Sequence, residues 1–154
     1  MQRGSLLIGW GNPLRQDDGI GWHLAHQLQA EAGHDRQVLA VQQLTPDLAG
    51  ALAGCRRALF VDAQMAPAGT PAVRMQITPL PAAAGGGRPF SHHQTPQALL
   101  QLSAALYGCT PQASQLLLPV TQLGFDAQLS AEAERLLSQA IALARAWLEE
   151  GGDA

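Results

Sequence analysis

Residues 5–20 read SLLIGWGNPLRQDDGI, and this stretch predicts a strand, a turn and the start of a helix. Its apolar run, Ser5 to Trp10, predicts a short buried strand that a Gly-Asn-Pro turn ends. From residue 20, apolar side chains recur at helical spacing, so we expect a helix that Gly33 closes. Asp17 and Asp18 lie between the two elements. A strand that leads into a helix in this way is typical of the first unit of an α/β fold.

The rest of the chain repeats this alternation. Thr45-Pro46 and Thr95-Pro96 each predict a capped helix start, and Ser130 predicts the N-cap of the last helix. We expect helices over residues 46–54, 96–108 and 131–148, strands over 38–44, 58–61 and 116–120, and an edge strand over 73–77. Residues 79–90, rich in Ala and Gly, predict a loop. The pattern predicts one α/β domain over residues 1–150, with a mostly parallel twisted sheet of about five strands, helices on both faces in a three-layer sandwich, and a frayed tail over 151–154.

Composition excludes several classes of function. The 154 residues include nine Arg and no Lys, and the formal net charge is −3, so no basic stripe indicates a nucleic acid or an anionic membrane as partner. Without Lys, Schiff-base chemistry and a phosphate-loop lysine are excluded. Cys55 and Cys109 lack CxxC spacing, and we expect two inert buried thiols in a reduced compartment. The N-terminal apolar run is too short for a signal peptide or a membrane span, so we expect a cytoplasmic protein.

Three side chains with useful chemistry follow the ends of the predicted strands. Asp18 lies beyond the first strand, Asp62 ends the third, and His93 precedes the helix that begins after Thr95. In parallel sheets, ligands gather where strands end and loops lead into helices, so these side chains can converge on one sheet edge. Two carboxylates and one imidazole form a plausible three-ligand metal site with open positions, and this donor set accepts Ni²⁺, Zn²⁺ and other divalent ions.

Each of these residues also has a purely structural interpretation. Acids at a helix N-terminus accept unpaired N–H bonds, and we expect Asp17 to cap the following helix while Asp18 points into the cleft. Asp62 is either a cap or a ligand, because burying an unpaired carboxylate is costly. Adjacent side chains diverge, so only one of His92 and His93 is expected to face the site. A lone histidine with no ligand role stays the alternative for that position.

Other catalytic and binding patterns are weaker. Residues 9–11 form a Gly-x-Gly after a strand, but Leu14 occupies the place of the third glycine of a dinucleotide loop. Gln42-Gln43 stands where that motif needs an acid, so nucleotide binding is a weak alternative. The sequence contains neither HExxH nor GxSxG. His23 and His26 have helical spacing but no further ligands nearby, and we expect them to be solvated.

Taken in order, these motifs resemble the hydrogenase maturation protease family. The resemblance rests on residues 9–21 (GWGNPLRQDDGIG), on Val61-Asp62-Ala63 and on Ser91-His92-His93-Gln94, and it covers nearly the whole chain. The family's metal-binding residues fall on Asp18, where members have Glu or Asp, on Asp62 and on His93. His92 is then expected to be a bystander. Pro96 departs from the apolar residue more common in the family at that point.

The resemblance implies an endopeptidase that removes the C-terminal extension from the nickel-loaded precursor of a nickel-iron hydrogenase large subunit. Asp18, Asp62 and His93 would then engage Ni²⁺ that the precursor supplies. Whether the metal polarises the scissile carbonyl, activates water or only docks the substrate stays open. The alternative is a non-enzymatic nickel-binding or assembly chaperone for the same precursor. In either case we expect a protein that is monomeric alone and binds neither nucleic acid nor membrane.

Overall fold

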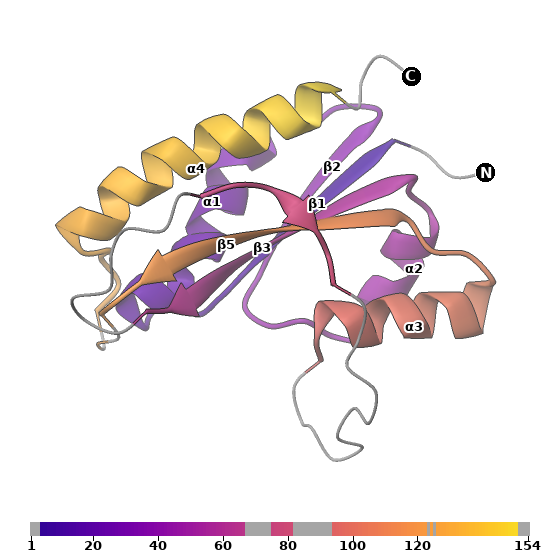
Figure 1. Cartoon of the computed structure of the whole chain (residues 1–154), viewed down its shortest axis with the longest axis horizontal. Coiled ribbons are helices and arrows are strands. Elements are labelled where there is room, and N and C mark those ends of the chain that lie inside the picture. The colour runs from indigo at the N-terminus through magenta and orange to yellow at the C-terminus, as the bar shows by residue number, and fades with distance from the viewer. Residues whose placement is uncertain (1–3, 67–74, 82–93, 123, 125, 151–154) are drawn as a thin grey trace.

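Figure 1 shows a central sheet with helices packed on both of its faces. The computed structural model describes residues 4–66, 75–81, 94–122, 124 and 126–150. The strands are β1 (Ser5–Trp10), β2 (Arg36–Val41), β3 (Arg57–Met65), β4 (Thr78–Pro79) and β5 (Gln112–Val120). The α-helices are α1 (Ile20–Leu28), α2 (Leu48–Ala53), α3 (Pro96–Tyr107) and α4 (Ala131–Glu150), and short 3-10 helices cover Gln16–Gly19 and Gln29–Glu31.

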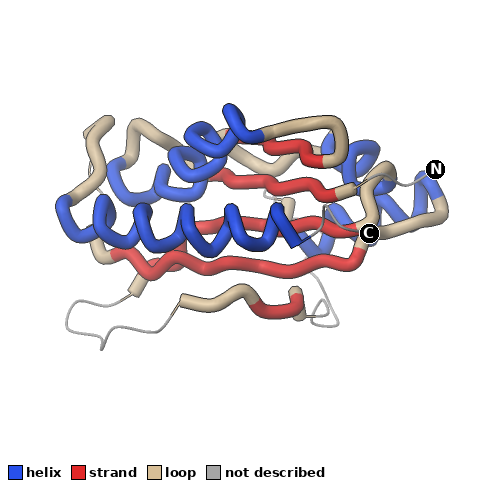
Figure 2. The backbone as a smooth tube through the Cα atoms, turned by 90° about the horizontal axis from the view of Figure 1, so that it is seen from above, coloured by secondary structure: helices blue, strands red, loops and turns tan. Residues whose placement is uncertain are grey.

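The five strands form one sheet in the order β2-β1-β3-β5-β4. All neighbours are parallel except β4, which runs antiparallel to β5. Figure 2 shows the strands side by side, with the two-residue β4 at one edge. The structure therefore confirms a single α/β domain with a mostly parallel sheet of five strands.

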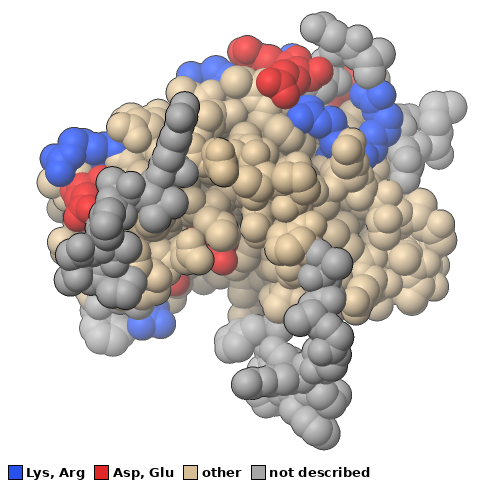
Figure 3. Space-filling view, in the orientation of Figure 1, with Lys and Arg blue, Asp and Glu red and all other residues tan. Residues whose placement is uncertain are grey.

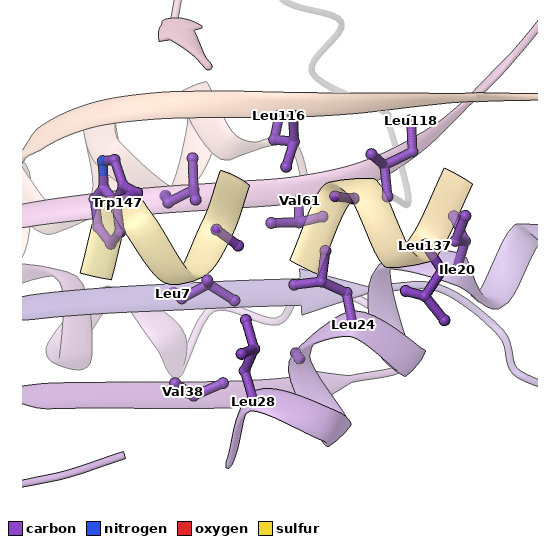
Figure 4. Close-up of a cluster of buried hydrophobic side chains, with 14 of the residues drawn as sticks. Leu7, Ile20, Leu24, Leu28, Val38, Val61, Leu116, Leu118, Leu137 and Trp147 are labelled. Atoms are coloured by element: carbon purple, nitrogen blue, oxygen red, sulfur yellow. The ribbon is translucent and has the colours of Figure 1, made fainter. Parts of the chain in front are cut away.

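Strand alternation builds two separate cores, one on each face of the sheet. Leu7, Leu59 and Val61 point to the face that α1 and α4 cover, whereas Leu6, Ile8 and Phe60 point to the face that α2 and α3 cover. Both sets are almost fully buried, as expected for a parallel sheet covered on both sides. Figure 4 shows the first core, in which Leu137 and Trp147 of α4 lie over β1, β3 and β5.

The order of the strands creates a crevice at their carboxyl ends. β1 lies between β2 and β3 and leads into α1 on one face, whereas the chain after β3 reaches α3 on the other face. Where neighbouring parallel strands send their connections to opposite faces, the loops separate and leave room for a ligand. Asp18 follows β1 and Asp62 lies near the end of β3, so both belong to this crevice.

Several predicted elements match the structure closely. β1 covers the predicted residues, Ser130 caps α4 by accepting a bond from the Ala133 N–H at 3.1 Å, and Thr95 caps α3 by accepting one from the Ala98 N–H at 3.0 Å. Gly108 ends α3 in the left-handed conformation with φ of 74°. The last strand differs from the prediction: from the sequence Pro119 is expected to interrupt it, but β5 runs unbroken from Gln112 to Val120, and Pro119 lies beyond Ser114 and Gln115, where β4 pairs with β5.

Other predictions need correction. The helix after β1 ends earlier than expected, at Leu28, and continues as the 3-10 turn Gln29–Glu31. Thr45 does not cap α2 with its hydroxyl, since that helix begins only at Leu48, with Asp47 as an N-cap whose side chain makes no capping bond. The predicted edge strand over 73–77 is wrong in position: residues 75–77 are not in a strand, residues 73–74 lie outside the described part, and the edge strand is β4. Most of the predicted 79–90 loop and the 151–154 tail also lie outside the described residues.

Charged side chains avoid one region of the surface. Neither α2 nor α3 contains an Asp, Glu or Arg, and Figure 3 shows an uncharged surface where α3 lies. Among the described residues drawn in that view, Arg and acidic side chains mix on the remainder of the surface and form no basic stripe. No helix within the described ranges is long and apolar enough to cross a membrane.

Candidate functional site

A cleft of about 770 Å³ opens at the carboxyl ends of the strands, and both predicted acids line it. Asp18 comes from the 3-10 turn after β1, and Asp62 comes from β3, where it is paired in register with Leu117 of β5. Such a volume lies in the ordinary range of ligand pockets. The structure therefore brings two of the three predicted site residues together.

The Asp18 carboxylate has a fixed position. Its Oδ2 accepts a hydrogen bond from the backbone N–H of Asn12 at 3.1 Å, and the Asn12 Oδ1 in turn accepts one from the Leu14 N–H at 2.9 Å. Gly11 makes this arrangement possible, because its φ is 152° and a Cβ there would overlap the carbonyl oxygen of Asp18. Residues 11–19, which we call the acidic loop, therefore fold back so that Asp18 faces the cleft.

Asp62 is the electrostatically unusual group of the cleft. The pKa of its carboxyl is raised from the ordinary value of 3.8 to about 7: burial is the largest cause, the nearby charge of Asp18 adds to it, and a backbone hydrogen bond from Ala63 partly opposes both effects. Two carboxylates that face one cleft without a cation between them are costly to keep ionised. A divalent cation held between them would remove that cost.

Asp17 is not the cap of its own helix, contrary to the prediction. The N-cap position of α1 is Gly19, and no side chain makes a capping bond there. Asp17 is instead buried, with 2% exposure, and both of its carboxylate oxygens accept bonds from Ser130 at the start of α4. The physical reason is the 3-10 turn Gln16–Gly19, which separates the acidic pair from the first turn of α1.

The third predicted ligand, His93, lies outside the described residues, as does His92. Gln94, the next residue along the chain, lines the cleft. Within the described part, no three His, Cys, Asp or Glu side chains gather closely enough to hold a metal ion. The carboxylate pair is thus the described portion of the candidate metal site, and His93 stays a prediction.

The cleft also has lining residues that the sequence did not single out as site residues. Gln42 and Gln43 follow β2 and line the cleft together with Thr45. Arg15 of the acidic loop contributes the one cationic side chain among the described lining residues. The sequence analysis placed both glutamines inside a strand predicted over residues 38–44, but β2 ends at Val41, so the two glutamines lie at the carboxyl edge of the sheet, where ligands gather.

The remaining histidines and cysteines do not join this site. His23 and His26 pack around Trp22, whose ring stacks on His26 with centroids 4.7 Å apart, so these histidines are not simply solvated. Burial lowers the pKa of His23, and its buried Nε2 has no hydrogen-bond partner among the described residues. Cys55 is buried, as predicted, and burial raises the pKa of its thiol to about 11, whereas Cys109 is only half-buried.

Comparison of the sequence with protein-family models and with curated proteins gives no match. Solved structures do match over nearly the full length. The hydrogenase maturating endopeptidase HybD from E. coli is 21% identical, with 97% of this chain and 94% of that chain covered and a TM-score of 0.72. The [NiFe] hydrogenase maturation protease HycI from Thermococcus kodakarensis is 18% identical, with 96% and 94% covered and a TM-score of 0.73.

The chain has the fold of the hydrogenase maturation proteases. A further match, an uncharacterized protein from Wolinella succinogenes, is 23% identical with a TM-score of 0.58, with 97% of each chain covered. At such identities the likeness concerns the fold. What individual side chains do in this chain depends on the chemistry of its own cleft.

Proposed function

We propose that this protein is an endopeptidase that removes the C-terminal extension from the nickel-loaded precursor of a nickel-iron hydrogenase large subunit in the cytoplasm. The observation that carries the proposal is the convergence of Asp18 and Asp62 on one cleft in a chain with the maturation-protease fold. The motif that predicted both acids from the sequence alone supports the same conclusion.

Nickel is part of the substrate in this proposal. Asp18 and Asp62 supply oxygen ligands, and His93 supplies an imidazole, to Ni²⁺ held by the precursor; borderline divalent ions accept this donor set. Because Asp18 is already oriented by the Asn12 N–H, little ordering of that side chain is needed on binding. Engagement of the metal then places the nearby peptide bond of the precursor in the cleft, where proximity lowers the barrier to hydrolysis.

The remaining cleft residues suit an extended peptide. Gln42 and Gln43 have exposed side chains that carry both hydrogen-bond donors and acceptors. Such side chains can form hydrogen bonds with the main-chain N–H and C=O groups of a bound peptide. The described wall has no charge other than Arg15, Asp18 and Asp62, so it does not demand a charged peptide side chain.

The decisive experiment incubates the protein with purified precursor, with and without nickel, and weighs both chains by mass spectrometry. We expect the precursor to lose its C-terminal peptide only when it contains nickel. Equal cleavage of the metal-free precursor contradicts recognition through nickel. An unchanged mass together with a stable complex with the nickel-loaded precursor favours the assembly chaperone.

Variants test the proposed ligands. Asp18→Asn, Asp62→Asn and His93→Ala should each lower cleavage strongly, because each removes one metal ligand. Asp35→Asn is the matched control, since Asp35 is exposed and lies at the opposite end of the sheet. Normal cleavage by His93→Ala would remove that residue from the site.

A further inference from the structure

We propose that Asp17 and Ser130 are positioning residues that hold the Asp18 carboxylate in the cleft. This inference rests on the proposed function for its kinetic consequence, but its structural consequence is measurable without any activity. The pair joins two segments that lie 113 positions apart in the sequence. It links the acidic loop to the connection between β5 and α4, which spans residues 121–130.

The link consists of two hydrogen bonds to one buried carboxylate. The Ser130 backbone N–H donates to Asp17 Oδ1 at 2.9 Å, and the Ser130 hydroxyl donates to Asp17 Oδ2 at 2.8 Å. The same hydroxyl oxygen accepts the N–H of Ala133, so Ser130 serves as the N-cap of α4 at the same time. A carboxylate that accepts a charge-assisted bond on each oxygen holds its partner at a defined distance and angle.

Backbone contacts from the same connection extend the link. The Gln16 N–H donates to the Asp126 carbonyl at 2.8 Å, and the Asp17 N–H donates to the Gln122 carbonyl at 3.3 Å. The Gln16 side-chain amide also donates from Nε2 to Gln122 Oε1 at 3.3 Å, so five hydrogen bonds tie Gln16 and Asp17 to the β5–α4 connection. In the acidic loop, Asp18 is the next residue, so its backbone position follows from this attachment.

Gln16 shows that the attachment imposes a conformation. Its φ is 51°, the one positive value among the described residues other than glycine. A left-handed backbone at such a residue costs free energy and persists where surrounding contacts enforce it. Gly124 leaves space for this arrangement, since a Cβ there would lie 2.7 Å from the Gln16 Oε1. The loop is therefore held in place by contacts made far from its own strand.

The first test measures the position of Asp18 directly. The Asn12 amide donates to Asp18 Oδ2, so its hydrogen exchange, followed by NMR, reports whether that carboxylate stays in place. We expect Ser130→Ala and Asp17→Asn each to speed exchange of this amide by about tenfold, the factor for loss of a typical hydrogen bond. The Ser5 amide, which donates to the Asp35 carbonyl at the opposite end of the sheet, should keep its rate.

Matched variants separate positioning from loss of a helix cap. Asp17→Asn removes the link but leaves the Ser130 cap of α4 intact. Ser130→Thr keeps a hydroxyl, so the Asn12 amide should exchange slowly in this variant. Ser138→Ala removes an exposed hydroxyl from the same helix and should leave the exchange rate of the Asn12 amide unchanged. In the double variant, Asp17→Asn with Ser130→Ala, the increase in Asn12 amide exchange, expressed as a free energy, should be smaller than the sum of the increases in the two single variants, because each substitution breaks the same link.

The second test is kinetic. With nickel-loaded precursor, Asp17→Asn and Ser130→Ala should lower kcat/KM by about tenfold at a temperature where both are folded, and Ser130→Thr should recover most of it. Unchanged Asn12 exchange in both Asp17→Asn and Ser130→Ala would overturn the inference. If the Asn12 amide exchanges faster only in Ser130→Ala, the effect comes from loss of the α4 cap, and the inference is also overturned. If the wild-type chain cleaves no precursor, the proposed function fails while the exchange result still decides this inference.

Discussion

Replacing Asp62 by Asn should make the metal-free protein more stable at high pH than the wild type. The Asp62 carboxyl lies largely buried beside Asp18, and its pKa is about 7 instead of 3.8. Asn has nearly the same shape and cannot ionise. The variant therefore removes the cost of a buried negative charge while leaving the packing around β3 in place.

The size of the effect follows from the two pKa values. Between 3.8 and about 7, at about 1.4 kcal/mol per pH unit, ionisation costs the folded chain about 4 kcal/mol more than the unfolded chain. The folded pKa is the higher one, so the favourable contribution is fully present below about pH 4 and is lost as the pH rises through 7. Between pH 5 and pH 8, the free energy of unfolding of the wild type should therefore fall by about 3 kcal/mol relative to that of Asp62→Asn. This value is an upper limit, because the Asp62 side chain retains some contact with water.

Urea unfolding followed by circular dichroism measures this difference. Both proteins are unfolded at pH 5 and pH 8 in the presence of EDTA, and the free energies of unfolding are compared. The titrating groups that do not interact with Asp62 contribute equally to both chains and cancel in the difference, whereas the interaction with Asp18 is part of the measured effect. Asp35→Asn, which changes an exposed acid far from the cleft, should show the same pH dependence as the wild type.

Parallel pH curves for the wild type and Asp62→Asn would refute this reasoning. Such a result means that the Asp62 carboxylate is well solvated or paired in the folded chain, and then the two acids do not share a dry cleft. Asp18→Asn offers an internal check, because removal of that charge should shrink the pH-dependent difference without abolishing it: burial is the larger of the two causes.

Three further predictions concern local features of the chain. In thermal unfolding, Gly11→Ala should lower the free energy of unfolding by about 2 kcal/mol or more, because a Cβ at this position overlaps backbone atoms. Its control is Gly33→Ala, which should be nearly neutral in the same assay because a Cβ at position 33 has no neighbour within 4 Å. In urea unfolding, Thr95→Ala should lower the free energy of unfolding by about 1 kcal/mol, because the variant loses the side-chain cap of α3. Thr45→Ala should leave this free energy unchanged, because no side-chain cap precedes α2. Cys55, with a pKa of about 11, should resist iodoacetamide at pH 8 until the chain is unfolded, as mass spectrometry of the alkylated protein would show.

The sequence predicted the fold class and the acidic edge of the sheet because these depend on local signals. A short apolar run between turn residues fixes β1, and acids in the segment after one parallel strand and near the end of another lie at the carboxyl edge of the sheet. Local patterns alone were therefore enough to place Asp18 and Asp62 together. Their shared cleft confirms that part of the prediction.

Identical local signals did not always give identical structures. Thr95-Pro96 begins α3 with a side-chain cap, but Thr45-Pro46 forms a turn in which the Thr45 carbonyl accepts the N–H of Leu48, and α2 begins only there. The residues that follow the two pairs differ, Asp47-Leu48 in one case and Gln97-Ala98 in the other, and Asp47 takes the N-cap position of α2. A Thr-Pro pair alone therefore does not fix where a helix begins, and tertiary context can override this local preference.

Asp17 could not be placed from the sequence for the same reason. Its partner, Ser130, lies 113 positions away, and the acid-rich helix start offered a simpler local explanation. The cap prediction treated both acids as parts of α1. In the structure, the first acid faces α4 and the second faces the cleft, so neighbouring carboxylates have opposite environments.

The places where this chain departs from its own local preferences lie within one part of the molecule. Asp62 keeps a buried carboxyl that costs stability at neutral pH, and Gln16 keeps a left-handed backbone two positions before Asp18. Substitution by Asn at position 62 would relieve the first cost, and Gly at position 16 the second, without any change in the surrounding hydrogen-bonded sheet. Gln16 does not itself line the cleft, but it belongs to the acidic loop that presents Asp18 there, so both departures concern the segments that carry the two cleft carboxylates. These two features are consistent with our proposal that Asp18 and Asp62 bind a cation in this cleft.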